Sequence, residues 1–356
     1  MRKPIRLVTI LLILLPVMLA AQDQSVKSMT EINVHLLGPL RIDNLPPVAI
    51  PPDNPQSSQK IQLGKLLYFD TRLSKDNTIS CATCHDPAMG WSDAGPTSKG
   101  INSQMGGRRS PPVSNAAYNP LQFWDGRAPS LEEQSKGPIQ NPIEMGNTHE
   151  VMIKTVEDIP GYVEIFKKVF REPKITIDMV ADAIASFERT VVTTDSPFDR
   201  FVKGDDKSLT PLEKEGLEIF NGKGHCSSCH WGGNFSDGRF HNLGVNPTDI
   251  AKPDEGRFVI TKDPKDMGAF KTPTVRDASL RAPYMHNGSE KTLEEVVEFY
   301  NIGGRVDDPN LDPLIVPLGL NDGEKKALVA FMTRALISTN PEVSNVKPVE
   351  TSEFPK

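Results

Sequence analysis

The sequence predicts a mainly α-helical, loop-rich protein built from two similar domains, and three observations support this. The length of 356 residues suggests about two domains. The 31 prolines and 26 glycines, with only 6% aromatic residues, predict much loop and little large apolar core. The pattern C-x-x-C-H occurs once in each half, each time after a stretch with helical periodicity.

The C-x-x-C-H pattern is typical of covalent c-type haem attachment. The two copies are Cys81, Cys84 and His85 in the first half, and Cys226, Cys229 and His230 in the second. Each thiol adds across a haem vinyl group, and the adjacent imidazole becomes the proximal iron ligand. The alternatives are a redox dithiol, disulfides or a zinc site. Paired zinc knuckles usually lie about 15–20 residues apart, whereas these motifs lie far apart and both carry the histidine. We therefore expect two covalently bound haem c groups.

The segment Met1–Ala21 has the pattern of a signal peptide. Arg2, Lys3 and Arg6 precede an apolar run over residues 7–19. The alternative is a membrane anchor, but this run is shorter than the ~20 residues that a span needs. Haem attachment to C-x-x-C-H takes place outside the cytoplasmic membrane, so we expect export to the periplasm. The formal net charge of −6 argues against nucleic acid and favours a basic partner.

Proline-rich stretches and helix caps define the predicted domains. Residues 22–56 should be extended because prolines interrupt them. A first domain is predicted over 57–195, a second over 196–340 and a tail over 341–356, with the boundary at Ser196-Pro197.

In the first domain, a helix over Ser58–Phe69 should lead into the haem motif. Residues 86–148 should be loop-rich, and helices should cover about 161–170 and 175–193.

In the second domain, Thr210-Pro211-Leu212-Glu213 is a capping box that begins a matching helix before Cys226. Helices capped by Thr292 and Asn321 should run to Tyr300 and to about Ser338.

Four further stretches carry a family resemblance. They are Gln122–Ala128 (QFWDGRA), Gly137–Met145 (GPIQNPIEM), Asp195–Asp199 (DSPFD) and Ala282–Gly288 (APYMHNG). Together, in this order, they resemble the bacterial dihaem cytochrome c peroxidase and MauG superfamily over about Lys60 to Ser338. The resemblance implies two cytochrome c-like domains, each wrapped around one covalent c-type haem.

The resemblance also implies roles for individual residues. The haem on His85 matches the peroxidatic site, and the haem on His230 matches the electron-transfer site. Trp124 matches the tryptophan between the haems, and Gln134 and Glu144 match the distal glutamine and glutamate. A carboxylate near iron can remove and return the peroxide proton. The alternative for Glu144 is a solvated loop acid.

Two departures concern iron ligands. Where the common peroxidases place a resting histidine ligand, this chain has Ile101, which predicts an open iron; Met105 and His149 are alternative occupants. Where they place a methionine on the second iron, it has Tyr300, as MauG-type enzymes do. A phenolate lowers the iron potential relative to methionine. The alternative is that Tyr300 is a core aromatic and that Met285 or Met267 is the ligand.

A third departure concerns the calcium site between the domains. The family supplies an asparagine where this chain has Arg109, and backbone carbonyls that match Arg281 and Pro283. The cationic side chains of Arg108 and Arg109 disfavour Ca²⁺, which takes oxygen ligands.

The predicted function is a periplasmic dihaem peroxidase that reduces hydrogen peroxide and shares high-valent iron across two haems. Electrons would come from a small donor protein, a cytochrome c or a cupredoxin. The alternatives are a MauG-type enzyme that oxidises side chains of a partner protein, a non-catalytic electron-transfer cytochrome and a ligand-binding sensor. A homodimer is left open, since family members are often dimers.

Overall fold

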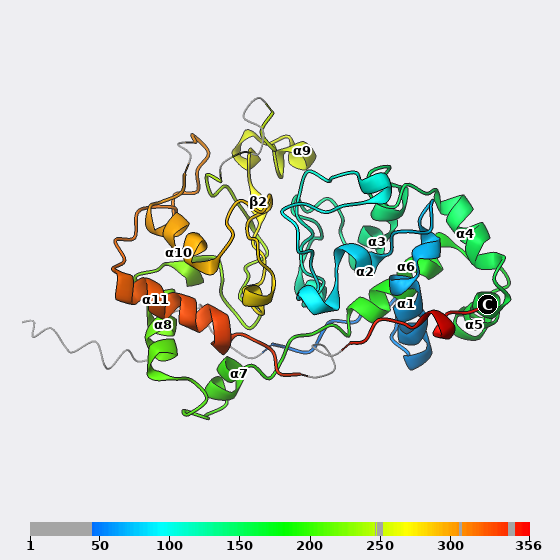
Figure 1. Ribbon diagram of the computed structural model, residues 1–356, viewed down its shortest axis with the longest axis horizontal. Helices are drawn as coiled ribbons and strands as arrows, with labels where there is room; N and C mark the ends of the chain where they lie inside the picture. Colours follow the sequence, from blue (N-terminus) through cyan, green and yellow to red (C-terminus); the bar gives the residue numbers. More distant parts are fainter. Residues whose placement is uncertain (1–44, 246, 248–251, 306–307, 341–345) are drawn as a thin grey trace, which may run out of the picture. The chain divides into compact units, whose positions relative to one another are not determined.

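The computed structural model describes residues 45–245, 247, 252–305, 308–340 and 346–356. The predicted signal peptide and most of the segment 22–56 lie outside these residues. Within the described residues the chain is mainly helical with long loops (Figure 1), as predicted. None of the helices in this part of the chain is long and apolar enough to cross a membrane.

Helices make up nearly all of the regular structure. In chain order they are α1 (Ser58–Phe69), α2 (Cys81–Cys84), α3 (Leu131–Gln140), α4 (His149–Glu157), α5 (Pro160–Phe170), α6 (Ile177–Glu188), α7 (Pro197–Val202), α8 (Pro211–Asn221), α9 (Phe258–Thr261), α10 (Leu293–Asn301) and α11 (Asp322–Ala330). Two short strands, β1 (Phe240–His241) and β2 (Phe270–Lys271), pair antiparallel. Five residues of π-helix, Phe331–Ala335, extend α11.

The helix caps explain where the predicted helices begin. Ser57 caps α1, and the capping box of Thr210 and Glu213 begins α8 with Pro211 at its first position. Thr292 and Asn321 cap α10 and α11, as predicted.

Three parts of the helix prediction were wrong. The helix predicted over 175–193 ends at Glu188, because the β-branched run from Thr190 to Thr194 disfavours helix. The stretch 86–148, predicted as loop-rich, contains α3. Ser130 caps this helix, and Pro138, which cannot donate a helical hydrogen bond, lies two residues before its end at Gln140. The helix α4 that follows was also missed.

The helix before each haem motif packs against a later helix in the same way. Helix α1 lies beside α6, and α8 lies beside α11 (Figure 1). A side chain at Gly64 would overlap the carbonyl oxygen of Ala183, and one at Gly216 would overlap that of Ala327. Each glycine therefore allows the two helix backbones to approach closely, so the two halves are built as copies of one unit.

This close packing predicts a large stability effect. Gly64→Val and Gly216→Val should each lower the free energy of unfolding by about 1–3 kcal/mol or more, as overpacking does. The gain in helix propensity on replacing glycine, which reaches about 1 kcal/mol only for alanine, is smaller. Thermal unfolding of the haem-loaded protein measures the effect. Gln62→Val, on the exposed side of α1, is the control. An unchanged midpoint for Gly64→Val would contradict the close approach of α1 and α6.

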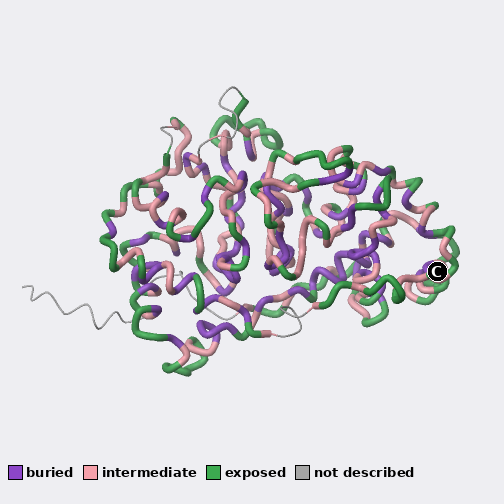
Figure 2. The backbone as a smooth tube through the Cα atoms, in the orientation of Figure 1, coloured by how far each residue is buried: buried purple, intermediate pink, exposed green. Residues whose placement is uncertain are grey.

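Buried apolar residues form two large clusters. The first contains residues from Leu63 to Val191, including Tyr68, Trp91 and Phe187, whose rings contact one another. The second runs from Phe198 to Leu336 and contains four phenylalanines in contact, Phe198, Phe220, Phe235 and Phe331. In Figure 2 the buried stretches lie mainly inside the molecule, and many of the outer loops are exposed.

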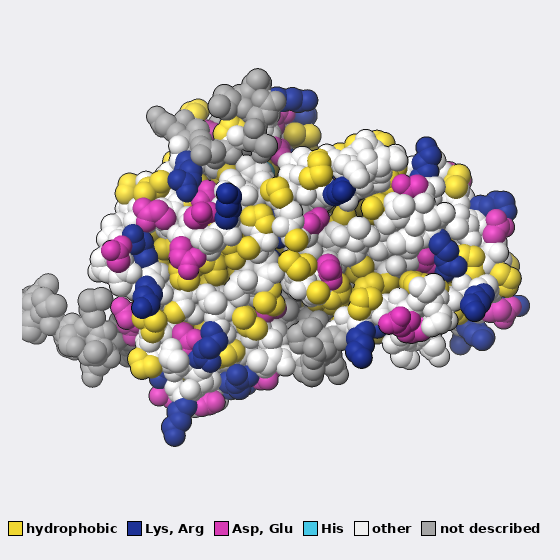
Figure 3. All heavy atoms as spheres, viewed as in Figure 1, with side chains coloured by type: hydrophobic (Ala, Val, Ile, Leu, Met, Phe, Trp, Pro, Cys, Tyr) yellow, Lys and Arg dark blue, Asp and Glu magenta, His cyan; other side chains and the backbone are white. Residues whose placement is uncertain are grey.

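The segment 346–356, at the end of the sequence, packs against the first cluster. Val346, Val349 and Phe354 contact it, and the Gly161 N–H donates to the Lys356 carbonyl at 2.9 Å. On the face drawn in Figure 3, acidic and basic side chains of the described residues are interspersed.

Candidate functional site

The first C-x-x-C-H motif lies on a single helical turn beside a cavity of about 400 Å³. The His85 N–H donates to the Cys81 carbonyl at 3.0 Å, which closes the turn. Residues three apart on a helix lie on the same side, so Cys81 and Cys84 both reach the cavity, where His85 joins them in its wall.

The second motif repeats this arrangement beside a larger cavity of about 1160 Å³. The His230 N–H donates to the Cys226 carbonyl at 2.9 Å. The His230 Nδ1 lies 2.9 Å from the Phe235 carbonyl, which fixes this nitrogen as the protonated one. The Nε2 lone pair is then free for a metal, the usual arrangement of a histidine ligand.

The donor chemistry at both cavities fits a covalently bound haem. All four cysteines are free thiols, and each pair lines its cavity together with the adjacent histidine. Burial lowers the pKa of His85 and His230, so both imidazoles are neutral, the form that binds a metal. Apolar side chains make up much of both cavity walls, as a porphyrin requires.

The predicted distal residues lie together in the wall of the first cavity. Gln134, from α3, and Glu144 both line it. The Asn141 amide donates to the Glu144 carboxylate at 2.8 Å. Burial raises the pKa of Glu144, and Arg127 and Asn141 oppose this only in part. Glu144 is thus a sheltered carboxyl at the same cavity as His85, which is unlike a solvated loop acid.

The structure also places the residues considered as occupants of the first iron. Ile101 is buried and packs toward Gly146, outside the described lining of the first cavity. The ring of His149 is bonded to the Lys136 carbonyl at 3.0 Å, and the Met105 side chain is 55% exposed. Neither of these two belongs to the described wall of the first cavity.

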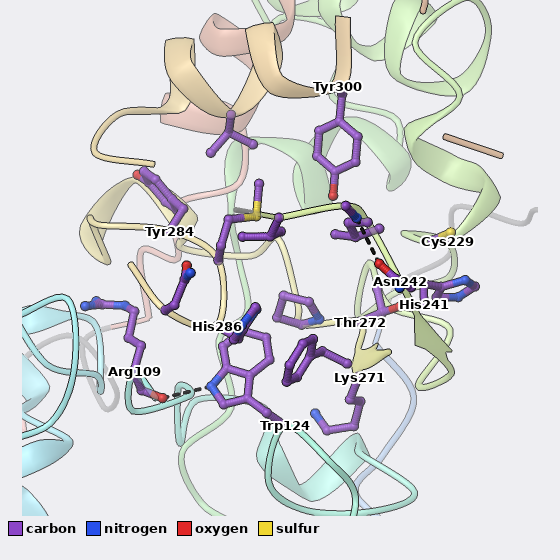
Figure 4. A pocket seen from close by; sticks show the side chains of 18 of the residues that line it. Arg109, Trp124, Cys229, His241, Asn242, Lys271, Thr272, Tyr284, His286 and Tyr300 are labelled. Carbon is purple, nitrogen blue, oxygen red and sulfur yellow. Dashed lines mark hydrogen bonds between the residues drawn. The ribbon is translucent and has the colours of Figure 1, made fainter. Parts of the chain in front are cut away.

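Tyr300 lies at the second cavity, and Figure 4 shows its hydroxyl directed into the open space. Burial raises its pKa, so without a metal the phenol keeps its proton. Met267 and Met285 line the same cavity, so both alternative ligands are also within the wall.

Trp124 is the only aromatic side chain among the described residues that lines both cavities. Its indole N–H donates to the Arg109 carbonyl at 2.8 Å, and its ring meets His286 edge-on at 6.5 Å between centroids (Figure 4). His286 in turn stacks on Phe270 at 3.7 Å. The structure therefore places Trp124 in the walls of both cavities.

Sequence reasoning missed two buried ionisable residues in the cavity walls. Glu188, at the end of α6, lines the first cavity, and burial raises its pKa to about 8. Lys271 lines the second, and burial lowers its pKa to about 8. Glu188 could have been found from the sequence, because it is an acidic residue on the apolar face of the predicted helix. Lys271 lies in a two-residue strand and gave no signal.

A mainly helical, loop-rich fold with two C-x-x-C-H motifs, each beside a cavity, is characteristic of c-type cytochromes with more than one haem. Comparison with known proteins narrows this class. A family model described as di-haem cytochrome c peroxidase matches residues 58–207. The cytochrome-c peroxidase IdrP1 of Pseudomonas sp. (strain SCT) is 39% identical over 326 residues, covering 83% of this chain and 86% of that protein.

Other similar proteins are MauG or MauG-like. The methylamine utilization protein MauG of Methylorubrum extorquens is 38% identical, covering 79% of this chain and 79% of that protein. Among solved structures, a MauG-like protein associated with microbial copper homeostasis has a TM-score of 0.76 at 31% identity, covering 84% of this chain and 96% of that one. The chain belongs to the di-haem cytochrome c peroxidase and MauG family, and it is an oxidoreductase.

Proposed function

We propose that this protein is a periplasmic enzyme with two covalent haems that reduces hydrogen peroxide, using electrons from a small donor protein such as a cytochrome c or a cupredoxin. One observation carries the proposal. Glu144 and Gln134 line the cavity of His85, and Trp124 connects this cavity with that of His230. A protein that only relayed electrons would not need a sheltered carboxyl at one of its cavities.

Glu144 is the proton carrier in this proposal. When bound, the haem on His85 supplies the iron at which the peroxide O–O bond breaks, and the haem on His230 supplies a second redox centre. In its ionised form, the Glu144 carboxylate accepts a proton from one peroxide oxygen and returns it to the departing oxygen. The bond from Asn141 holds the carboxylate in place for both transfers.

Gln134 and Arg127 support this transfer without exchanging protons. The neutral amide of Gln134 can orient peroxide by hydrogen bonding. Arg127 also lines the cavity and lowers the pKa of Glu144, which keeps part of the carboxyl population ionised. Its guanidinium lies 3.4 Å from the centroid of the Phe123 ring and bonds Asp125, so it is held in one position.

Tyr300 favours a second candidate function, the oxidation of side chains in a partner protein, as in MauG-type enzymes. A phenolate ligand stabilises oxidised iron, and this would suit an enzyme that holds oxidising equivalents before passing them to a protein. The position of the Tyr300 hydroxyl at the second cavity supports this candidate.

The role of Tyr300 can be tested by one substitution. Tyr300→Met should raise the reduction potential of the His230 haem, because a thioether replaces an anionic phenolate. Redox titration followed by absorption spectroscopy measures the potential. Met267→Leu is the matched control and should leave it unchanged. If Met267→Leu shifts the potential and Tyr300→Met does not, Tyr300 is a core aromatic and the methionine is the ligand.

Mass spectrometry and peroxide turnover together test the proposed function. The mass of the denatured protein should exceed that of the polypeptide by two haem groups. The purified enzyme should consume hydrogen peroxide when it is supplied with a reduced small cytochrome c or cupredoxin. A single haem, or two haems without any reaction with peroxide, would contradict the proposal.

A further inference from the structure

Arg109 is a buried cation that forms no salt bridge among the described residues; burial lowers its pKa, and the Asp93 carboxylate opposes this only from a distance. The residue is 4% exposed. Its guanidinium donates to three backbone carbonyls, those of Gly95, Arg281 and Ala282, the last two at 3.0 and 3.4 Å. A buried charge is costly unless polar groups compensate it, and here carbonyl oxygens do so.

These carbonyls come from segments that are far apart in the sequence. Gly95 follows the first haem motif, whereas Arg281 and Ala282 lie beyond the second. The Arg109 side chain therefore ties the two halves of the chain together. Carbonyl oxygens converging on one cation are also the ligands that Ca²⁺ takes in proteins.

The main chain of Arg109 belongs to the connection between the cavities. Its N–H donates to the His286 carbonyl at 2.8 Å, and its carbonyl accepts the Trp124 indole N–H at 2.8 Å (Figure 4). Arg109 itself lines both cavities. We call Arg109, Trp124, His286 and the three carbonyls the junction. Because Trp124 is hydrogen-bonded to Arg109, a shift of Arg109 would also shift Trp124.

The residues of the junction do not fit a calcium ion. The Arg281 carbonyl, which the family resemblance assigns to calcium, already accepts from the guanidinium. At the asparagine position of the family, Arg109 supplies a cation in place of an oxygen ligand. A divalent ion beside a guanidinium would meet like charge and too few oxygens.

We infer that the Arg109 guanidinium takes the place of a calcium ion in the junction. The protein therefore binds no calcium there, and the guanidinium holds together the residues that line both cavities. A guanidinium suits this role because it stays charged when buried and offers several donors in one plane. Unlike a metal ion, it cannot be lost to chelators. The inference concerns how the two halves are held and does not depend on which substrate the haems serve.

The haem-loaded wild-type protein gives the first test. After purification with calcium in the buffers and dialysis, elemental analysis should find no stoichiometric calcium. Treatment with EGTA, and then addition of calcium chloride, should change neither the unfolding midpoint nor the absorption spectra of the haems. One tightly bound calcium per chain, or a midpoint that falls with EGTA, would overturn the inference.

Substitutions give the second test. Arg109→Asn should lower the unfolding midpoint, and calcium chloride should raise it again, with affinity in about the 10⁻⁴–10⁻³ M range of weak sites. Arg109→Lys keeps the charge and should gain no response to calcium. Arg257→Gln is the matched control, since Arg257 also donates to two carbonyls, those of Asp125 and Gly126, at 2.8 and 2.9 Å. It should also gain no calcium response.

Each outcome of these substitutions decides the inference. An Arg109→Asn variant as stable as the wild type without calcium would show that the junction needs no cation. A destabilised variant that calcium does not restore would make Arg109 an ordinary hydrogen-bonding residue, and would also overturn the inference. If the variant does not fold, the wild-type calcium analysis still decides. Because none of these readouts uses peroxide, a failure here is distinct from a failure of the proposed function.

Discussion

Glu144→Gln should slow the reaction of the oxidised enzyme with hydrogen peroxide by about 10²–10⁴-fold, the usual cost of losing a general acid–base group. Glutamine has nearly the same shape as glutamate but cannot carry the proton. The absorption spectra of both haems should stay unchanged, because Glu144 lines the cavity wall without being a predicted iron ligand. Rapid mixing with peroxide measures the rate.

The pH dependence of the peroxide reaction rate distinguishes a proton-transfer role of Glu144 from a purely structural one. Burial raises the pKa of Glu144 above its ordinary value of 4.5, and the ionised form is the one that accepts a proton. The wild-type rate should therefore fall as the pH drops through this raised pKa. Glu144→Gln should lose this acidic limb, whereas Glu133→Gln, at an exposed acid on α3, should keep both rate and limb. An unimpaired Glu144→Gln would return Glu144 to the role of a loop acid.

Trp124→Ala should allow the first reaction with peroxide but should confine oxidation to the haem on His85. Trp124 is the only aromatic ring among the described residues that lines both cavities, so its removal takes away the oxidisable group between them. The absorbance change of the His230 haem should be largely lost. If that haem still oxidises at the wild-type rate, Trp124 is not the connection.

Trp124→Phe separates the ring from its hydrogen bond. Phenylalanine keeps an aromatic group between the cavities but cannot donate to the Arg109 carbonyl. It is also harder to oxidise than an indole. If the indole carries the oxidising equivalent, Trp124→Phe should resemble Trp124→Ala. If packing alone matters, it should resemble the wild type.

Local signals in the sequence predicted much of the fold. The caps of α8, α10 and α11 were predicted from their own residues, because a capping bond needs only neighbours along the chain. Helix α3 was missed because the whole stretch 86–148 was interpreted as loop from its Gly-Gly, Pro-Pro and Asn-Pro pairs, although Ser130 caps a helix within it.

In the candidate site, too, local patterns were predicted from the sequence, whereas contacts between distant segments were not. The two haem motifs are local patterns, and the family resemblance supplied Trp124, Gln134 and Glu144, which the structure places in the cavity walls. The resemblance implied the Arg281 carbonyl beside Arg109, but Glu188, Lys271 and the carbonyls of Gly95 and Ala282 were not predicted. Their burial and partners depend on segments distant in sequence, such as Gly95 and Arg281, which only the folded chain brings together.

Rapid mixing of the fully oxidised, haem-loaded enzyme with hydrogen peroxide, with no reductant present, tests the central claim most directly. The family resemblance matches Ile101 to the position of a resting histidine ligand, and Ile101, Met105 and His149 all lie outside the described wall of the first cavity. Nothing should therefore need to be displaced, and the haem absorption should change at once, at a rate proportional to peroxide concentration. If the spectrum changes only after an electron is supplied, the first iron is blocked at rest, which would contradict this account.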